Sequence, residues 1–185
     1  MIKQKKSSFS KNKTGKQFST LVITIVLAVV FLGTVGVLAG KNGKFAAGAG
    51  PLVKVNLVGS VERNGEKMTL EEAKVVKPNE ILHWTIASKN EGDGEARQYK
   101  AVGKISQGTV YVMGSAKADG SAVAKFSIDG GNEFSEKPLT EEKQADGSVK
   151  QVPAPVEMFT DVRFEWANPI NSNEERNASY DVRVK

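Results

Sequence analysis

The sequence predicts an all-β protein, an immunoglobulin-like β-sandwich preceded by one N-terminal transmembrane or signal-anchor helix. Three observations lead to this prediction. Beyond residue 52, short alternating or apolar runs are separated by Gly, Asn, Asp and Pro, which is the pattern of strands and turns. No part of that region sustains the 3.6-residue period of an amphipathic helix. Residues 18–39, in contrast, form an uncharged run that follows a lysine-rich tail.

Residues 1–17 form this basic tail, and residues 18–39 are long enough as a helix to cross a bilayer core of about 30 Å. The tail holds six lysines, and no Asp or Glu occurs before Glu62. Because positive charge accumulates on the cytoplasmic side of membrane helices, we expect a cytoplasmic tail and an extracytoplasmic C-terminal domain. The small-residue spacing before a signal-peptidase site is present at Ala39, so cleavage followed by secretion is an alternative.

A pilin-like leader is the other alternative for the N-terminus, because Gly15 stands among lysines just before the apolar run. Leaders of type IV pilins have this arrangement, and their mature helices form the core of a filament. Those helices usually carry a glutamate five residues in, whereas this chain has Thr20 there. The alternatives differ in the first residue expected for the mature chain, which is Met1 for an anchor, Gly40 for a secreted domain and Lys16 for a filament subunit.

Charge and cysteine content exclude several functional classes. Six of the 26 Lys and Arg residues precede the apolar run, which leaves 20 against 21 Asp and Glu in the rest of the chain. A net charge of −1 with interspersed signs is not typical of a nucleic-acid-binding protein, so no nucleic-acid partner is predicted. Without cysteine there are no disulfides, thiol nucleophiles or thiolate metal sites, and the fold depends on its core alone.

The exported part is predicted to be one domain. Residues 40–51 form a Gly/Ala-rich linker, and residues 52–185 suffice for a single core but not for two ordinary domains. Eight strands are expected, at residues 52–58, 73–77, 81–89, 97–105, 109–115, 122–128, 161–166 and 179–185. Turn signals lie at residues 63–65, 78–79, 90–94, 119–120 and 129–131. This spacing is typical of immunoglobulin-like sandwiches, and the Asn, Asp and Gly residues supply the positive-φ positions of hairpin turns.

Period-two alternation assigns both tryptophans to the core. In the third predicted strand, Trp84 shares a face with Leu82 and Ile86, whereas His83 lies on the other face. In the seventh predicted strand the same alternation places Trp166 on the apolar face. Both indoles are therefore expected to pack inside the domain, with a ligand-binding role as the alternative.

Residues 136–157 interrupt this rhythm with a charged stretch that ends in Pro153-Ala154-Pro155. Loops longer than about 12–15 residues are commonly functional or disordered, and prolines cannot serve a central strand. We therefore expect either a solvated hairpin or a binding loop. Because loops vary freely on a rigid sandwich, we expect any recognition of a partner to lie in this segment.

Chemical motifs are few. His83 is the only histidine, so a cluster of histidine metal ligands is impossible, and no nucleophile elbow, phosphate-binding loop or H-E-x-x-H sequence occurs. No catalytic, cofactor-binding or metal-binding residue is assigned, and no cofactor is expected. The segment of Asn90, Glu91, Asp93 and Glu95 offers oxygen ligands for calcium without the EF-hand spacing, and a solvated turn is the competing interpretation.

Residues 127–134, SIDGGNEF, fit the S-x-D-x-G-x-x-[WF] form of the Asp-box hairpin of sialidases and other β-proteins. In this motif we expect Asp129 to accept backbone hydrogen bonds across the turn, with the glycines permitting positive φ. Phe134 is expected to return to the core. Since Asp-boxes lie away from catalytic centres, the motif predicts a structural hairpin.

Four segments in a fixed order resemble one known family. They are Pro78-Asn79-Glu80 before ILHWTIASKN, then ISQGTVYVMGSA, FSIDGGNEFS and TDVRFEWANPI. The series resembles the bacterial surface repeat domain called domain of unknown function eleven, an immunoglobulin-like β-sandwich, and it spans about residues 75–184. The resemblance implies a surface, cell-wall or filament-associated role and brings no catalytic residues. Asn79 stands where that family usually has glycine, and a single copy is present instead of a tandem array.

We therefore predict a non-enzymatic, membrane-tethered extracytoplasmic β-sandwich that acts as a structural or protein-interaction module of the bacterial cell envelope. The expected partners are the membrane, through residues 18–39, and an envelope or surface protein. The sequence names no small-molecule ligand. The alternatives are a pilin-like filament subunit, a secreted surface domain, and an extracytoplasmic hydrolase whose site lacks a sequence motif.

Overall fold

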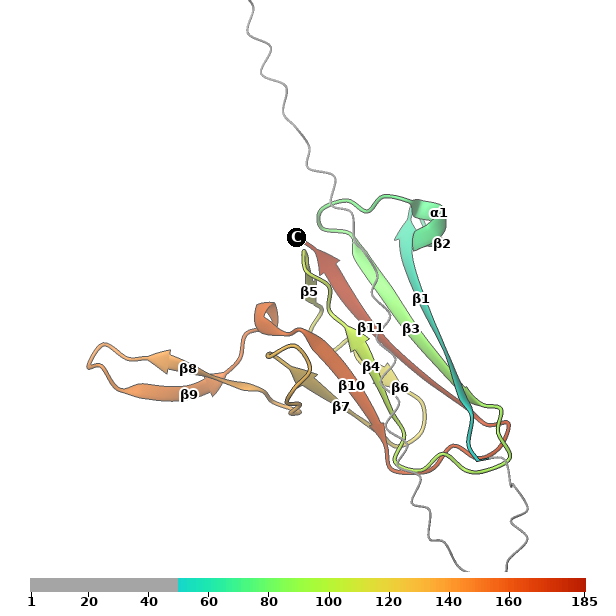
Figure 1. Ribbon diagram of the computed structural model, residues 1–185. Helices are drawn as coiled ribbons and strands as arrows, with labels where there is room; N and C mark the ends of the chain where they lie inside the picture. The colour runs from blue at the N-terminus through green and yellow to red at the C-terminus, as the bar shows by residue number, and fades with distance from the viewer. Residues whose placement is uncertain (1–49) are drawn as a thin grey trace, which may run out of the picture. The chain divides into compact units, whose positions relative to one another are not determined.

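The structure is a computed structural model that describes residues 50–185, and this part of the chain is almost entirely β (Figure 1). All of its strand pairings are antiparallel, which confirms the all-β prediction. The helical elements of residues 50–185 are the four-residue helix α1, Leu70–Ala73, and the 3-10 turn η1, Val156–Met158. The predicted tail (1–17), apolar run (18–39) and most of the linker (40–51) lie outside the described residues.

The larger sheet contains six strands. They are β1 Val53–Arg63, β2 Glu66–Thr69, β3 Ile81–Asn90, β5 Thr109–Tyr111, β6 Lys117–Ala118 and β11 Glu175–Val184. The order across the sheet is β2-β1-β3-β11-β5, and β6 also pairs with β11. Strand β3 therefore lies between β1 and β11 and is hydrogen-bonded along both of its edges.

The smaller sheet has three strands, and a separate hairpin has two. The three strands are β4 Lys100–Lys104, β10 Asp161–Trp166 and β7 Ala122–Ser127, with β10 in the centre. The hairpin consists of β8 Leu139–Lys143 and β9 Val149–Pro153, and among the described strands these two pair only with each other. Figure 1 shows this hairpin extending away from both sheets.

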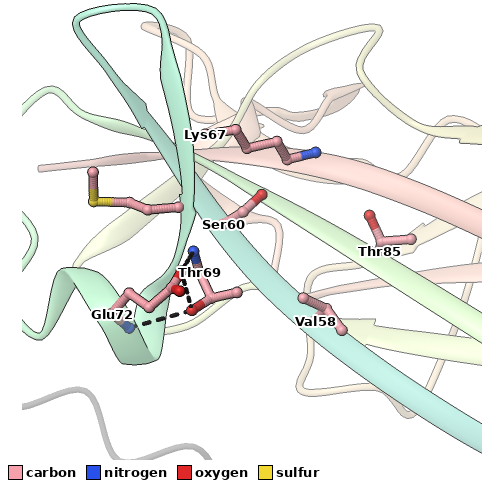
Figure 2. Close-up of a pocket in the computed structure, with 7 residues that line it drawn as sticks. Val58, Ser60, Lys67, Thr69, Glu72 and Thr85 are labelled. Atoms are coloured by element: carbon pink, nitrogen blue, oxygen red, sulfur yellow. Dashed lines mark hydrogen bonds between the residues drawn. The ribbon is translucent and has the colours of Figure 1, made fainter.

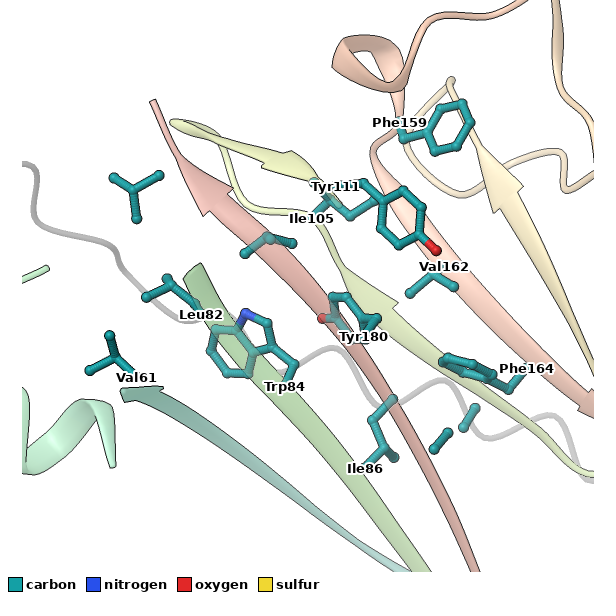
Figure 3. Close-up of a cluster of buried hydrophobic side chains, with 14 of the residues drawn as sticks. Val61, Leu82, Trp84, Ile86, Ile105, Tyr111, Phe159, Val162, Phe164 and Tyr180 are labelled. Carbon is teal, nitrogen blue, oxygen red and sulfur yellow. The ribbon is translucent and has the colours of Figure 1, made fainter. Parts of the chain in front are cut away.

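The two sheets face each other across one hydrophobic core, which gives a sandwich-like arrangement (Figure 3). Trp84 from β3 and Tyr180 from β11 meet Phe164 and Val162 from β10 there, and all four side chains are buried. At Gly103 in β4 an added Cβ would lie 2.3 Å from Cε1 of the Tyr180 ring. The close packing of β4 against the Tyr180 ring thus requires glycine at position 103.

The structure confirms the predicted positions of both tryptophans. Trp84 is 7% exposed and Trp166 is 4% exposed, and both belong to the core cluster. The indole Nε1 of Trp166 donates a hydrogen bond to the Asp119 carbonyl over 3.0 Å. That bond satisfies the polar group which a buried indole brings into the core.

Four of the five predicted turns contain positive-φ residues as the sequence indicated, and in the turns at 119–120 and 129–131 these residues are glycines. Asn64 (φ 54°) and Gly65 (φ 81°) close the two-residue hairpin between β1 and β2, as expected for a type I′ turn. Asn79 has φ 70°, and asparagine tolerates this left-handed region better than other non-glycine residues. Asn79 can therefore occupy the left-handed position of the turn before β3.

Several strand predictions are wrong. The strand expected at residues 73–77 is absent, because Thr69 and Glu72 form a capping box that starts α1, and Lys74 ends it with φ 58°. Strand β1 continues to Arg63 through Gly59, a residue whose absent side chain leaves room for Leu70 and Trp84. Strands β2, β6, β8 and β9 are too short or too polar to show period-two apolar alternation.

Candidate functional site

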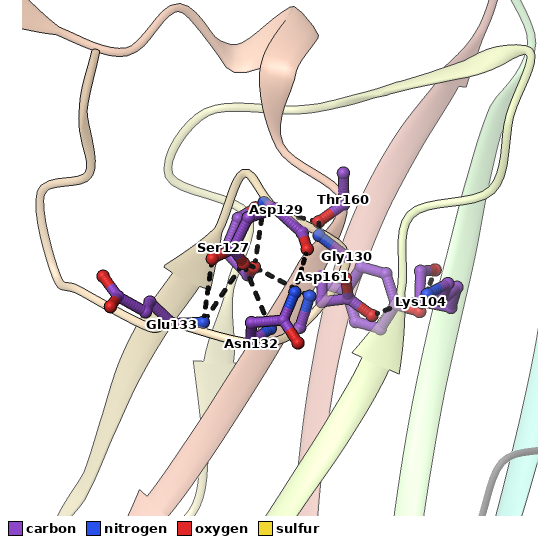
Figure 4. A network of polar contacts seen from close by, with 10 residues as sticks. Lys104, Ser127, Asp129, Gly130, Asn132, Glu133, Thr160 and Asp161 are labelled. Atoms are coloured by element: carbon purple, nitrogen blue, oxygen red, sulfur yellow. Dashed lines mark hydrogen bonds and ion pairs between the residues drawn. The ribbon is translucent and has the colours of Figure 1, made fainter.

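The Asp-box segment forms a closed network of hydrogen bonds (Figure 4). Oδ1 of Asp129 accepts from the Ser127 hydroxyl over 2.6 Å and from the backbone N–H groups of Asn132 and Glu133 over 3.1 Å. The pKa of the Asp129 carboxyl is lowered chiefly by the hydrogen bond from Ser127 and then by the one from Glu133. Because the donors of its own loop engage this carboxylate, the geometry supports the predicted structural hairpin.

Phe134 does not return to the core, contrary to the prediction. Its ring is half-buried on the outer face of the smaller sheet, where the guanidinium carbon of Arg163 lies 4.1 Å from the ring centre. Arg163 alternates with Val162 and Phe164, which face inward, so it points to the outside. A cation–π contact therefore holds the end of this loop in place of apolar burial.

A buried carboxylate lies beneath the same loop. Asp161, at the start of β10, is 3% exposed, and Oδ1 is 3.3 Å from the Lys104 ammonium (Figure 4). Burial, and secondly the charge of Asp161, raises the pKa of Tyr180, whose hydroxyl donates to the Lys104 carbonyl over 2.8 Å. Lys104 thus links the loop side of the smaller sheet to the larger sheet. The arrangement stabilises the packing and keeps the Asp161 carboxylate away from solvent.

Ser60, His83 and Asp181 stand side by side across β1, β3 and β11 on the outer face of the larger sheet. Nδ1 of His83 is 2.8 Å from Oδ1 of Asp181, the contact that orients the histidine in a catalytic triad. The Ser60 hydroxyl, however, donates to the His83 carbonyl over 3.5 Å. The row therefore has the residue types of a serine hydrolase without the hydroxyl–imidazole hydrogen bond that activates the nucleophile.

A shallow concavity of about 400 Å³ adjoins this row where β1 and β3 meet β2 and α1 (Figure 2). Its lining consists of Val58, Ser60, Lys67, Met68, Thr69, Glu72 and Thr85. The Glu72 carboxylate accepts hydrogen bonds from the backbone N–H and the hydroxyl of Thr69, so it is engaged in the cap of α1. What remains is a mostly apolar surface with the hydroxyls of Ser60 and Thr85 and one lysine, and this chemistry favours no particular ligand.

Asn90, considered above as a calcium ligand in an exposed turn, is the last residue of β3 and is completely buried. Its Oδ1 accepts from the N–H groups of Leu52 (3.0 Å) and Gly92 (3.1 Å). Its Nδ2 donates to the carbonyls of Gly94 (2.7 Å) and Ile170 (2.9 Å). One side chain therefore ties three backbone segments together at this end of the larger sheet.

The remaining oxygen ligands of the calcium hypothesis do not converge. Glu91 pairs with Lys54 over 2.5 Å, Glu95 pairs with Arg97, and Asp93 is exposed. No group of three or more His, Asp or Glu in residues 50–185 is placed to hold a metal ion. The solvated-turn interpretation is also incomplete, since an added Cβ at Gly92, a buried residue, would lie 2.3 Å from the Gly50 carbonyl oxygen.

The segment 136–157 contains the hairpin that the sequence left as one of two interpretations. Gly147 (φ 87°) lies in its turn, where the N–H of Gln144 donates to the Ser148 carbonyl over 2.8 Å. Leu139 and Val149 are 51% and 59% exposed although they are apolar. The hairpin is thus confirmed as a solvated element, and recognition of a partner by it stays a prediction.

Sequence reasoning missed the network around Asn90 and the pairing of His83 with Asp181. A signal for the first was present, because the alternation of Leu82, Trp84 and Ile86 continues to Ser88 and Asn90, which are both 0% exposed. The second depends on the register between β3 and β11. These strands are far apart in the sequence, and the chain carries no local sign of their pairing.

Comparison with known proteins finds no matching family model, no matching curated protein and no matching solved structure. Within residues 50–185, none of the helices has the length and apolar character needed to span a membrane.

Proposed function

We propose that this chain is a membrane-tethered, extracytoplasmic β-sandwich of the immunoglobulin-like type that acts as a structural or protein-interaction module of the bacterial cell envelope. The observation that carries the proposal is the contrast between a tightly packed two-sheet body and the exposed hairpin of β8 and β9. A body of this kind presents variable loops on a rigid support, which is how many binding domains are built. The series of motifs that resembles the surface repeat family supports the same proposal.

The lysine-rich tail and the apolar run at residues 18–39 support the proposed extracytoplasmic location of the domain. Because the chain lacks cysteine, single cysteines can report on topology. Ser148→Cys lies at the tip of the exposed hairpin, and Ser7→Cys lies in the basic tail. In intact cells we expect a membrane-impermeant maleimide to label Ser148→Cys only, and both variants after lysis. Labelling of Ser7→Cys before lysis would contradict the proposed topology.

Sequencing the mature N-terminus separates the tether from its alternatives. A chain that begins at Met1 and stays with the membrane after carbonate washing agrees with the tether. A chain that begins at Gly40 would be secreted after cleavage, and one that begins at Lys16 would be a filament subunit. Either of the latter two results would contradict the proposal of a tethered module and favour the corresponding alternative.

The interaction role is tested with the full-length chain and a variant lacking residues 143–150. We expect an envelope protein that co-purifies with the intact chain after chemical cross-linking to be lost from the shortened variant, because the exposed hairpin carries the contact. Met113→Ala is a matched control, since it removes a 69% exposed apolar side chain outside the hairpin. Equal recovery with all three proteins would contradict a role of the hairpin in recognition.

A further inference from the structure

Within residues 50–185, strand β1 has an unpaired edge along its first half. On one side it pairs with β3 from Val53 to Val61. On the other side β2 covers only Ser60 to Arg63, because the chain turns into α1 after Thr69. Figure 1 shows β1 at the border of its sheet, with β2 and α1 only at its C-terminal end. No other strand in residues 50–185 pairs with this edge.

The backbone groups that face the open edge can be identified from one hydrogen bond. The Leu52 carbonyl accepts from the Glu91 N–H over 2.8 Å, so the backbone of Leu52 points toward β3. Hydrogen-bonding groups alternate between the two sides of a strand. Val53, Val55 and Leu57 therefore direct three N–H and three C=O groups away from β3, toward the open edge.

The side chains of this edge are unusually apolar for an exposed strand. Leu52, Val55 and Val58 are 51%, 40% and 40% exposed. Natural edge strands commonly carry charges or proline that prevent pairing with another chain. The segment 52–58 contains a single charged residue, Lys54, and Glu91 of the same chain neutralises it.

We propose that a second copy of this chain pairs with this edge, β1 against β1 in antiparallel orientation, about a two-fold axis at Val55. In this register Val55 faces Val55 of the second copy, and the outward backbone groups of Val53 face those of Leu57. On the opposite face, exposed Leu52 lies beside exposed Val58 of the second copy. Lys54 lies beside the uncharged Asn56, so the ladder places no like charges opposite each other.

The register is specified by the pattern itself. A shift of one residue would place outward backbone groups opposite groups that point toward β3, and the ladder would lose its hydrogen bonds. A shift of the axis to Asn56 would set Val53 against Gly59 and lose two apolar pairs. Since the same surface serves both copies, the contact is isologous and closes as a dimer without forming a filament. The dimer does not depend on the proposed membrane tether.

Oxidative cross-linking of the full-length chain in cells tests this dimer. Across the two-fold axis the two Val55→Cys residues would have Cα atoms about 5.5 Å apart, which suits a disulfide. Asn56→Cys would place its Cα atoms more than about 7 Å apart, beyond disulfide reach. Val102→Cys is the matched control, because Val102 is 51% exposed on β4, the edge strand of the smaller sheet.

We expect a disulfide-linked dimer for Val55→Cys and little or none for the two other variants. Equal cross-linking of Val55→Cys and Val102→Cys would show that the disulfides form by random collision of the chains, and this would overturn the proposal. Preferential cross-linking of Asn56→Cys would overturn the axis at Val55. A Val55→Cys product that contains only a different protein would assign the edge to another partner and also overturn the proposal.

A second measurement avoids disulfide chemistry. In mild detergent the full-length chain should have the mass of a dimer by light scattering, and Val55→Lys should have that of a monomer, because two lysines would meet at the axis. Val102→Lys should remain a dimer. Circular dichroism of all three proteins checks that the fold is kept. A wild-type monomer at high concentration, or a folded Val55→Lys dimer, would overturn the proposal.

Discussion

Strand β3 and the hairpin of β8 and β9 show opposite uses of the same secondary structure. Every second residue of β3 from Leu82 to Asn90 is buried, and both edges of the strand are hydrogen-bonded. In the hairpin, apolar Leu139 and Val149 remain exposed, and its two strands pair with no other strand of residues 50–185. From this difference we expect the body to determine stability and the hairpin to tolerate changes of sequence. The following predictions test this contrast, beginning with the largest effect.

Trp84→Ala should have the largest effect. It removes a buried indole from the centre of the core, and such substitutions destabilise by about 3–5 kcal/mol. Chemical denaturation followed by circular dichroism measures the change in the free energy of unfolding. His83→Ala, the adjacent residue on the half-exposed face, should cost much less. The reverse order would mean that the register of β3 places the wrong face inside.

Asn90→Ala should come second. The substitution leaves the N–H groups of Leu52 and Gly92 without their acceptor and the carbonyls of Gly94 and Ile170 without their donor. Unpaired buried polar groups cost about 1–3 kcal/mol, so we expect a loss of about 3 kcal/mol of unfolding free energy. A loss comparable with that of an exposed substitution would show that water replaces the side chain and that the network is not essential.

Glu165→Gln tests the charged outer face of the smaller sheet. The pKa of Glu165 is lowered, first by the hydrogen bond from Lys125, against the opposing effect of burial, and also by the nearby charges of Arg163 and Lys100. A carboxyl with a lower pKa in the folded state adds stability above its unfolded pKa and loses it as the pH falls through the folded one. We expect a loss below about 1 kcal/mol at pH 7.

The wild type and Glu165→Gln should converge in unfolding free energy in the acid range below about pH 4. Glu141→Gln, on the exposed hairpin, is the control and should leave stability nearly unchanged across the same range. A constant difference between Glu165→Gln and the wild type from pH 7 to pH 3 would assign the effect to packing and not to charge.

Deletion of residues 143–150 should have the smallest effect. These residues form the turn and the adjoining ends of β8 and β9, and shortening a flexible segment changes closure entropy by only about 0.6 kcal/mol per twofold change in length. The thermal midpoint should stay within a few degrees of that of the intact chain. A protein that unfolds after this deletion would show that the hairpin belongs to the packed body.

Much of the body could be predicted because period-two alternation is a local property of the chain. This alternation correctly placed Trp84 and Trp166 in the core, and the Asn64-Gly65 pair correctly predicted a tight hairpin turn. The helix α1 was missed because its capping box is followed by a short apolar run at residues 73–77 that also fits a strand. The length of β1 was missed because Gly59 reads as a turn, whereas it accommodates two neighbouring side chains.

The functional features were less accessible from sequence. Asparagine is common in turns, so the sequence placed Asn90 in one. Its actual role depends on a hydrogen bond to Ile170, which is 80 residues away. Phe134 fits the Asp-box pattern, but its environment is set by Arg163 on another strand. The open edge of β1 follows from the absence of a pairing partner for residues 53–59 within residues 50–185, which only the sheet order reveals. Such features depend on register and topology, and neither is encoded by any single motif.

Native-state hydrogen exchange tests the central contrast most directly, because it measures the opening free energy of each strand. We expect amides of β3, β10 and β11 to exchange only through global unfolding, with free energies that fall together in Trp84→Ala. Amides of β8 and β9 should exchange through local opening and remain unchanged in that variant. Protection of the hairpin equal to that of β3, lost in parallel in Trp84→Ala, would contradict the division between a packed body and an independent hairpin.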